Sequence, residues 1–301
     1  MIRESQHGFR KERSCLTNLL TFLDKVTGCI NSGNSVDAVF LDFAKAFDKV
    51  PHSRLASKLR SHGIDRKLSC LIMEWLKDRK QRVVIRGTFS DWISVLSGIP
   101  QGSVLGPILF LVYINNLDYG VRNWILKFAD DTKIFSQVSS PEDYINLQKD
   151  LNSLVTWAEE CQMLFNVGKC KVMQFGRVNK KEIIIRRTKS LRLQVPKRIM
   201  GIVITSDLKF SEQCSQAYSK ASRVLGMIKR TIVYKSADTL VRLYKSLVRP
   251  HLEYCTAAWS PHYLKDRKLL EKIQRRFTRM VPGLQELPFE SRFFEIVDIG
   301  P

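Results

Sequence analysis

The sequence predicts a mixed α/β (α+β) fold with a helical C-terminal region. Short apolar runs of strand length, at residues 36–41 and on both sides of an acidic pair within 124–135, lie among segments with helical spacing of apolar residues. From residue 211 to about residue 280 the helical spacing is nearly continuous. A chain of 301 residues is long enough to bury a large core shared by two or three subdomains.

The elements are expected in a regular order along the chain. An amphipathic helix at 16–30, capped by Ser14, is followed by a turn at Gly33-Asn34 and the buried strand at 36–41. The middle part predicts helices at 51–62 and 66–77, strands near 81–86 and 92–96, and a buried helix at 104–117 that is too short to span a bilayer. The remaining predicted elements are a helix opened by Pro141, strands near 171–175 and 200–204, and helices at 211–230, 236–247 and 262–280.

The tetrad Phe128-Ala129-Asp130-Asp131 predicts a β-hairpin with acids at its tip, because apolar runs flank it on both sides. Adjacent ionised carboxylates repel each other, and a bound hard cation such as Mg²⁺ relieves that repulsion. Asp42 directly follows the buried strand at 36–41. Three carboxylates at neighbouring strand ends could hold two metal ions for in-line phosphoryl transfer. An isolated Asp-Asp pair is more often a solvated turn than a metal site, so the surrounding motifs decide between these two interpretations.

Five segments support the catalytic interpretation. They read QHGFRKERS at 6–14, LDFAKAFDKVPH at 41–52, SGIPQGSVLGP at 97–107, FADD at 128–131 and FNVGKCKVM at 165–173. In order and approximate spacing they resemble the last fingers motif and motifs A, B, C and D of reverse transcriptases, in particular those of vertebrate-type, non-LTR (LINE-like) retrotransposons. The resemblance covers nearly the whole chain and weakens between about 176 and 197. It implies a right-hand polymerase with partial fingers at 1–35, a palm with finger insertions at 36–205 and a helical, thumb-like region at 206–301.

The resemblance implies an RNA-directed DNA polymerase, a nucleotidyltransferase that extends a DNA primer with dNTPs on an RNA template. Asp42, Asp130 and Asp131 would hold two Mg²⁺ ions, with Mn²⁺ as a possible substitute, and the main-chain carbonyl of Phe43 would assist. Lys169 would protonate or neutralise the leaving pyrophosphate. If this segment is a strand, the side chain of Lys171 would point to the opposite face from that of Lys169, which distinguishes the two lysines.

Six residues are implied in nucleotide binding: Arg10, Arg13, Phe43, Phe47, Gln101 and Gly102. Phe47, five positions after Asp42, would place its ring under the sugar and exclude a 2′-hydroxyl. The alternative is that Phe43 and Phe47, four positions apart, form one apolar face of a helical turn. Arg10, Lys11 and Arg13 could grip the triphosphate, since arginine pairs well with phosphate oxygens, although exposed arginines are usually just solvated.

The segment around Gly98, Pro100 and Gly102 predicts a tight backbone passage, because glycine lets the main chain approach a ligand closely. Gln101 would then face the nucleotide or its templating base. Asp48 is interpreted as a structural or helix-capping acid rather than a metal ligand.

The charge of the chain predicts a polyanionic partner or an acidic membrane surface, because 49 basic residues against 29 acidic ones give a formal net charge of +20. Residues 169–198 contain eleven Lys or Arg and one acid. Arg275, Arg276 and Arg279, on the last predicted helix, are candidates for contact with the backbone of an RNA–DNA hybrid. The alternative is a solvated face of a helical domain.

Seven cysteines without a C-x-x-C pair, and no signal peptide, predict a reduced intracellular protein, nuclear or cytoplasmic, neither secreted nor bound to a membrane. The chain begins directly at the last fingers motif and shows no endonuclease segment, which predicts an N-terminally truncated fragment. The alternative to an active polymerase is a catalytically inactive, basic, nucleic-acid-binding remnant of a retroelement. The sequence leaves the oligomeric state open.

Overall fold

The structure, a computed structural model, describes residues 2–176, 192–193, 197–289 and 291. It divides into two compact units, Met1–Gln194 and Val195–Pro301, and each is described by itself. Most of the basic stretch at 169–198, including the segment where the family resemblance weakens, lies outside the described residues. The division into fingers, palm and thumb at 1–35, 36–205 and 206–301 stays a prediction.

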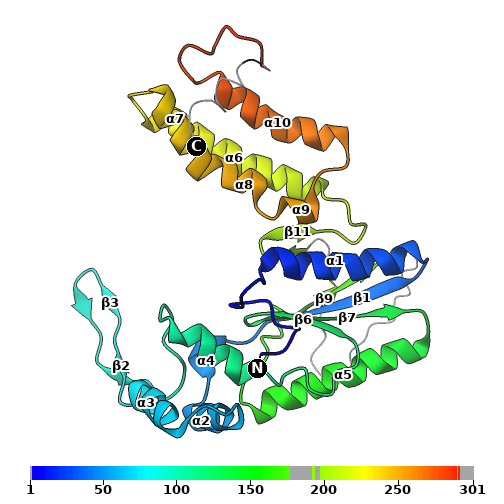
Figure 1. Ribbon diagram of the computed structural model, residues 1–301, viewed down its shortest axis with the longest axis vertical. Helices are drawn as coiled ribbons and strands as arrows, with labels where there is room; N and C mark the ends of the chain where they lie inside the picture. Colours follow the sequence, from blue (N-terminus) through cyan, green and yellow to red (C-terminus); the bar gives the residue numbers. More distant parts are fainter. Residues whose placement is uncertain (1, 177–191, 194–196, 290, 292–301) are drawn as a thin grey trace. The chain divides into compact units, whose positions relative to one another are not determined.

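The first unit is built on a five-stranded sheet in the order β6-β7-β1-β8-β9 (Figure 1). Its central strand, β1 (Ser35–Leu41), runs antiparallel to both β7 and β8. All its residues from Val36 onward are buried, which explains its nearly continuous apolar sequence. The other strands are β6 (Trp124–Phe128), β7 (Asp131–Val138), β8 (Lys171–Phe175) and β9 (Arg192–Leu193), the last parallel to β8.

Helices cover both faces of this sheet. Figure 1 shows α1 (Cys15–Asn31) on one side and α5 (Pro141–Glu160) on the other; α1 packs on β1 and β6, and α5 packs on β7. Ser14 caps α1 by accepting a hydrogen bond from the amide of Thr17, which confirms the predicted start of this helix. Three further helices, α2 (His52–Ser61), α3 (Arg66–Leu76) and the apolar, buried α4 (Leu105–Ile114), occupy the predicted positions within a few residues.

Between α3 and α4 the chain forms a projecting β arm, visible in cyan in Figure 1. Two strands were predicted here, and the structure has four short ones in two antiparallel pairs: β2 (Lys80–Gln81) with β5 (Ile93–Ser94), and β3 (Val84–Ile85) with β4 (Thr88–Phe89). All eight strand residues are exposed.

The second unit is mainly helical, as predicted. Its helices are α6 (Ser211–Thr231), α7 (Ala237–Leu243), α8 (Arg249–Glu253), α9 (Thr256–Trp259) and α10 (Leu264–Thr278), and a π-helical turn η2 (Tyr244–Val248) joins α7 to α8. A β-hairpin of β10 (Lys197–Ile199) and β11 (Ile202–Ile204) precedes them. The core of the unit lies between α6, α10 and α8, where the rings of Tyr244 and Phe277 stack with centroids 4.1 Å apart.

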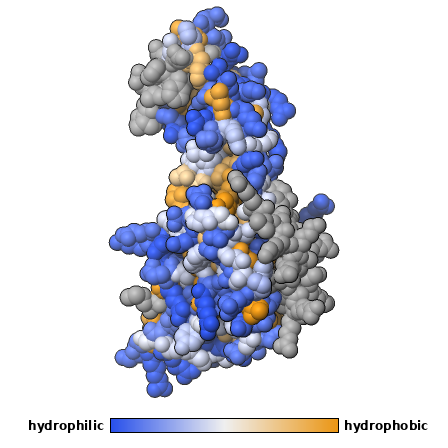
Figure 2. Space-filling view, turned by 90° about the vertical axis from the view of Figure 1, so that its right-hand side faces the viewer, coloured by the Kyte–Doolittle hydropathy of each residue, from blue (hydrophilic) through white to orange (hydrophobic). Residues whose placement is uncertain are grey.

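Within the described ranges, no helix combines the length and the apolar character needed to cross a bilayer. The face of the chain drawn in Figure 2 is mainly hydrophilic, and its apolar residues appear in separate patches.

Candidate active site

Asp42 and Asp130 come together because neighbouring strands of the sheet end at the same edge. In the β1–β7 ladder Leu41 lies opposite Thr132, and in the β6–β7 hairpin Phe128 pairs with Asp131. Asp42, the residue after β1, therefore reaches the level of the turn that contains Asp130. The predicted hairpin with acids at its tip is confirmed.

A third segment brings a cation to the same place. Phe43 pairs with Phe165 in an antiparallel bridge, and the amide of Asn166 donates to the carbonyl of Asp42 at 2.7 Å. The following turn carries Lys169, whose Nζ lies 3.4 Å from Asp42 Oδ1. Because the lysine side chain is 64% exposed, the ion pair stabilises the fold by at most about 1 kcal/mol. Lys169 is therefore free, in energetic terms, to leave Asp42 for an anionic ligand.

These residues line one cavity of about 570 Å³. Seven lining residues were predicted from the sequence: Asp42, Phe43, Phe47, Gln101, Gly102, Asp130 and Lys169. The cavity also contains five residues that were not predicted: Phe9, Lys45, Ala46, Ser103 and Pro107. All five lie inside the motif segments, so their positions in the sequence could have indicated that they lie near the site. The sequence gives no indication of which way their side chains point.

The aromatic side of the cavity is rigidly supported. The half-buried ring of Phe47 stacks on Phe110 of α4, with centroids 4.6 Å apart and planes 17° apart. Phe43 is buried and stacks on Phe165, also at 4.6 Å. The two rings do not share a helical turn, because Lys45 has a left-handed backbone (φ 55°) and only Ala46–Lys49 forms a short 3-10 helix. The interpretation of Phe43 and Phe47 as one helical face is therefore wrong.

The segment 97–107 passes close to the main chain of Asp48, as its glycines predicted. Gly98 has φ +91°, and a Cβ built there would lie 2.7 Å from the Asp48 carbonyl oxygen, so only glycine fits. The Gln101 side chain donates from Nε2 to Asp48 Oδ1 at 3.0 Å while it lines the cavity. Asp48 therefore has a structural role as the partner of this segment.

The electrostatics of the cavity favour a cation. Burial raises the pKa of the Asp130 carboxyl above its ordinary value, and the neighbouring charge of Asp42 raises it further, against the opposing effects of a backbone hydrogen bond and of Lys169. A divalent cation bound to both carboxylates would remove the repulsion, and oxygen ligands suit Mg²⁺. The donor set of Asp42 and Asp130 therefore fits a hard divalent ion.

Asp131 differs from its neighbour. It is exposed and is not among the residues that line the cavity. In the parts of the chain that the structure describes, no group of three or more His, Cys, Asp or Glu side chains is arranged to hold a metal ion. The structure thus brings together two of the three predicted metal-binding acids.

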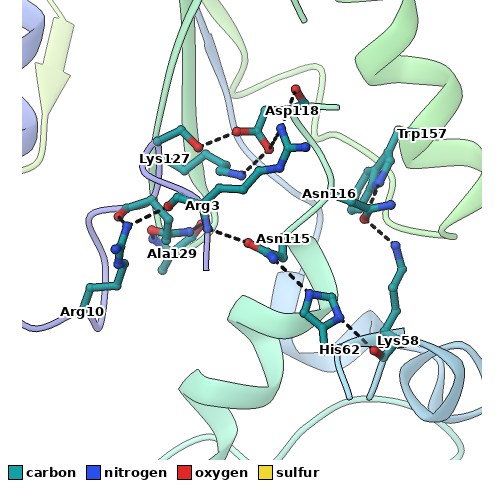
Figure 3. Close-up of polar contacts among 12 residues, drawn as sticks. Arg3, Arg10, Lys58, His62, Asn115, Asn116, Asp118, Lys127, Ala129 and Trp157 are labelled. Atoms are coloured by element: carbon teal, nitrogen blue, oxygen red, sulfur yellow. Dashed lines mark hydrogen bonds and ion pairs between the residues drawn. The ribbon is translucent and has the colours of Figure 1, made fainter. Parts of the chain in front are cut away.

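Two predicted nucleotide-binding arginines lie outside the cavity lining. Arg10 and Arg13 both pair with Glu4, at 3.4 and 2.5 Å, and Arg10 also donates to the carbonyl of Arg3 at 2.8 Å (Figure 3). Phe9, their neighbour in sequence, lines the cavity instead.

The arginines predicted to bind nucleic acid lie together in the second unit. Arg275, Arg276 and Arg279 line a basic cavity of about 590 Å³, together with Lys229, Lys235, Lys272, Met280 and Gln285. Arg275 pairs with Glu271 at 3.4 Å, and Arg276 donates to Ser222 Oγ at 3.2 Å. Six cations and no acid line this cavity among the described residues, which suits a ligand with several negative charges.

Comparison with known proteins shows the class of this protein. Residues 1–228 match the family described as "Reverse transcriptase (RNA-dependent DNA polymerase)", and the chain belongs to this family of enzymes. The chain is 23% identical to the "Probable RNA-directed DNA polymerase from transposon X-element" of Drosophila melanogaster, over 94% of this chain and 32% of that protein. It is 26% identical to the "RNA-directed DNA polymerase from mobile element jockey" of Drosophila funebris, over 98% and 33%. It is thus a reverse transcriptase domain of the non-LTR, jockey- and X-element-like type, and it spans about a third of the length of these relatives.

The fold also resembles a solved structure, that of apo telomerase from Candida tropicalis. The TM-score is 0.52, with 15% identity over 98% of this chain and 48% of that chain. This similarity concerns the fold alone and confirms the predicted mixed α/β architecture. The vertebrate-type origin and the N-terminal truncation stay predictions.

Proposed function

We propose that this chain is a catalytic domain that adds dNTPs to the 3′-hydroxyl of a DNA primer on an RNA template. The observation that carries the proposal is the cavity of about 570 Å³, in which two acids, three aromatic rings, an amide and two lysines from separate parts of the chain converge. The combination matches what in-line phosphoryl transfer needs: metal ligands, a wall for the sugar and a cation for the leaving group.

Asp42 and Asp130 are the proposed metal ligands, and the carbonyl of Phe43 is proposed to assist. Two Mg²⁺ ions bound there, or Mn²⁺ in their place, would activate the primer hydroxyl and neutralise charge on the triphosphate. Asp131, on the exposed side of the turn, is the proposed secondary ligand, and its substitution should have the smaller effect.

The other cavity residues have proposed roles in positioning the nucleotide. The ring of Phe47, held by Phe110, would lie under the sugar and collide with a 2′-hydroxyl. Gln101, oriented by Asp48, would face the nucleotide or its templating base. Lys169 would exchange its exposed contact with Asp42 for the departing pyrophosphate. Arg10 and Arg13 would have to leave Glu4 to reach a triphosphate.

Primer extension on poly(rA)/oligo(dT) with the full chain tests the proposal. Asp42→Asn and Asp130→Asn should each abolish dTMP addition while binding of the primer–template stays near that of the unaltered chain. Asp24→Asn, an exposed acid on α1, is the matched control and should extend the primer normally. Wild-type extension rates in either cavity variant would refute the two-metal assignment.

A second candidate function, nucleic-acid binding without catalysis, is favoured by the basic cavity of the second unit. Its six cations would neutralise phosphates of an RNA–DNA hybrid or of its single strands. Each phosphate contact contributes a slope of about −0.9 to log K against log salt on B-form DNA. Replacing Arg275, Arg276 and Arg279 by Ala should therefore flatten the measured slope by roughly 2 to 3. An unchanged slope would show that these arginines face solvent, and binding without extension by the unaltered chain would favour the inactive remnant.

A further inference from the structure

The buried side chain of Gln6 holds the turn that carries Asp130. Gln6 is only 2% exposed, and its Oε1 accepts hydrogen bonds from the amide of Ala129 at 2.9 Å and from the amide of Gly8 at 2.8 Å. Its Nε2 donates to the carbonyl of Ala129 at 3.4 Å. One side-chain amide thus pairs with both the N–H and the C=O of the residue before Asp130, in the way that a neighbouring strand would.

The turn needs such support because of its backbone conformation. Ala129 has φ +51°, in the left-handed region that alanine rarely adopts, and it is 6% exposed. Because Ala129 is buried, water cannot readily satisfy its peptide groups if Gln6 is lost. A change in the Ala129 peptide would rotate the following residue, and with it the carboxylate of Asp130.

The segment that carries Gln6 is itself fixed against β6. The amide of Lys127 donates to the carbonyl of Ser5 at 2.7 Å, and the amide of His7 donates to the carbonyl of Lys127 at 2.8 Å. Gly8 lies so close to the turn that a Cβ there would be 2.4 Å from the nitrogen of Ala129.

Asp118 joins this segment to β6 through both oxygens of its carboxylate. Ser5 Oγ donates to Asp118 Oδ2 at 2.5 Å, and the other oxygen of that carboxylate pairs with the buried Lys127 Nζ at 2.9 Å (Figure 3). The position of Gln6 is therefore determined by contacts on both sides of it.

We propose that Gln6 is a positioning residue for metal binding: its side-chain amide fixes the Ala129 peptide and thereby the direction of the Asp130 carboxylate. The inference rests on the proposed role of Asp130 as a metal ligand. Groups that orient metal ligands through hydrogen bonds typically change metal affinity or activity by about 10–100-fold when they are removed. Gln6 belongs to this class, with one peptide unit between it and the ligand.

Mn²⁺ binding to the full chain, measured by electron paramagnetic resonance without substrate, tests the proposal. Gln6→Met keeps the size of the side chain and removes the hydrogen bonds. It should raise the Kd for Mn²⁺ about tenfold or more. The matched control is Asn18→Leu, because Asn18 is also a fully buried amide and its side chain donates to the carbonyl of Lys127 at 3.0 Å rather than to the Ala129 peptide. It should change Kd by less than about twofold, since it leaves the Ala129 peptide in place.

The outcomes separate this inference from the proposed function. If Asp130→Asn abolishes Mn²⁺ binding but Gln6→Met binds as the unaltered chain does, the role of Gln6 is refuted and that of Asp130 stands. An equal loss of Mn²⁺ affinity in Gln6→Met and Asn18→Leu would also refute the role of Gln6, because both substitutions would then act through general damage to β6. If Asp130→Asn leaves Kd unchanged, the metal role of Asp130 is refuted and the Gln6 inference with it.

A measurement on the unaltered chain covers the case in which Gln6→Met does not fold. If the turn and the metal are coupled, each must stabilise the other, so Mg²⁺ should slow hydrogen exchange of the Ala129 amide. Asp130→Asn should abolish that slowing. An Ala129 amide whose exchange is insensitive to saturating Mg²⁺ would overturn the proposal.

Discussion

Asp37, a buried carboxyl in the middle of β1, should make the stability of the sheet depend on pH. It is 3% exposed and accepts one hydrogen bond, from Gln174 Nε2 at 3.4 Å. Burial raises the pKa of this carboxyl from 3.8 to about 6, although the Gln174 bond opposes the shift. Unfolding restores the ordinary pKa, so the unfolded chain ionises at lower pH than the folded one. The folded state is therefore most favoured below about pH 4 and loses this advantage as the pH rises through about 6.

The difference of about two pKa units corresponds to about 3 kcal/mol at pH 8. Asp37→Asn keeps the shape and the acceptor for Gln174 but cannot ionise. It should raise the free energy of unfolding by about 3 kcal/mol at pH 8 and by less than about 1 kcal/mol at pH 4. Urea unfolding of the full chain at both pH values, followed by tryptophan fluorescence, measures the effect.

The control for this measurement is Asp24→Asn, an exposed acid on α1, which should change little at either pH. An equal effect of Asp37→Asn at pH 4 and pH 8, or a loss of stability at pH 8, would refute the reasoning from burial.

Three other substitutions test different parts of the structure. Phe47→Val should lower the ratio of dNTP to rNTP incorporation about tenfold or more in single-nucleotide addition, whereas Phe165→Val, outside the cavity, should not. Lys169→Gln should lower kcat by about 10²–10⁴ with KM for dNTP nearly unchanged; a rise in KM alone would make Lys169 a binding residue. Asp118→Ala leaves the fully buried Lys127 ammonium without its partner and should cost about 3–5 kcal/mol in urea unfolding. The double variant Asp118→Leu with Lys127→Met should recover most of that loss, and if it does not, the ion pair is not the cause.

The elements that build the site could be predicted because their signals are local. The apolar run before Asp42 and the two runs around the Asp130-Asp131 pair have the length and pattern of strands, and they form β1, β6 and β7. The β1–β7 register then brings Asp42 to the turn, which the resemblance had implied. Motif segments likewise placed Phe47, Gln101 and Lys169 in the cavity.

The orientation of individual side chains could not be predicted, because it depends on long-range contacts. Which of two adjacent acids enters the cavity depends on the tight turn at Ala129, and that turn depends on Gln6, more than a hundred positions away. Arg10 and Arg13 both form ion pairs with Glu4, a residue outside the motif that contains the two arginines. The left-handed backbone conformation of Lys45 also could not be predicted from its residue type, since lysine rarely adopts this conformation.

The contact between Ser5 and Asp118 has a consequence for synthesis of the protein. Its two residues are separated by 113 positions, so residues 5–8 leave the ribosome long before the carboxylate that receives them. Contacts between residues so far apart in the sequence form late, since closing the long loop between them costs conformational entropy before the contact can stabilise the chain. A nascent chain that ends before Asp118 therefore has no site to receive its own N-terminal segment, and the turn of Asp130 acquires its support only after the hairpin itself has been made. Because Asp118 and the hairpin both precede residue 139, this support can form while the later part of the chain is still being made.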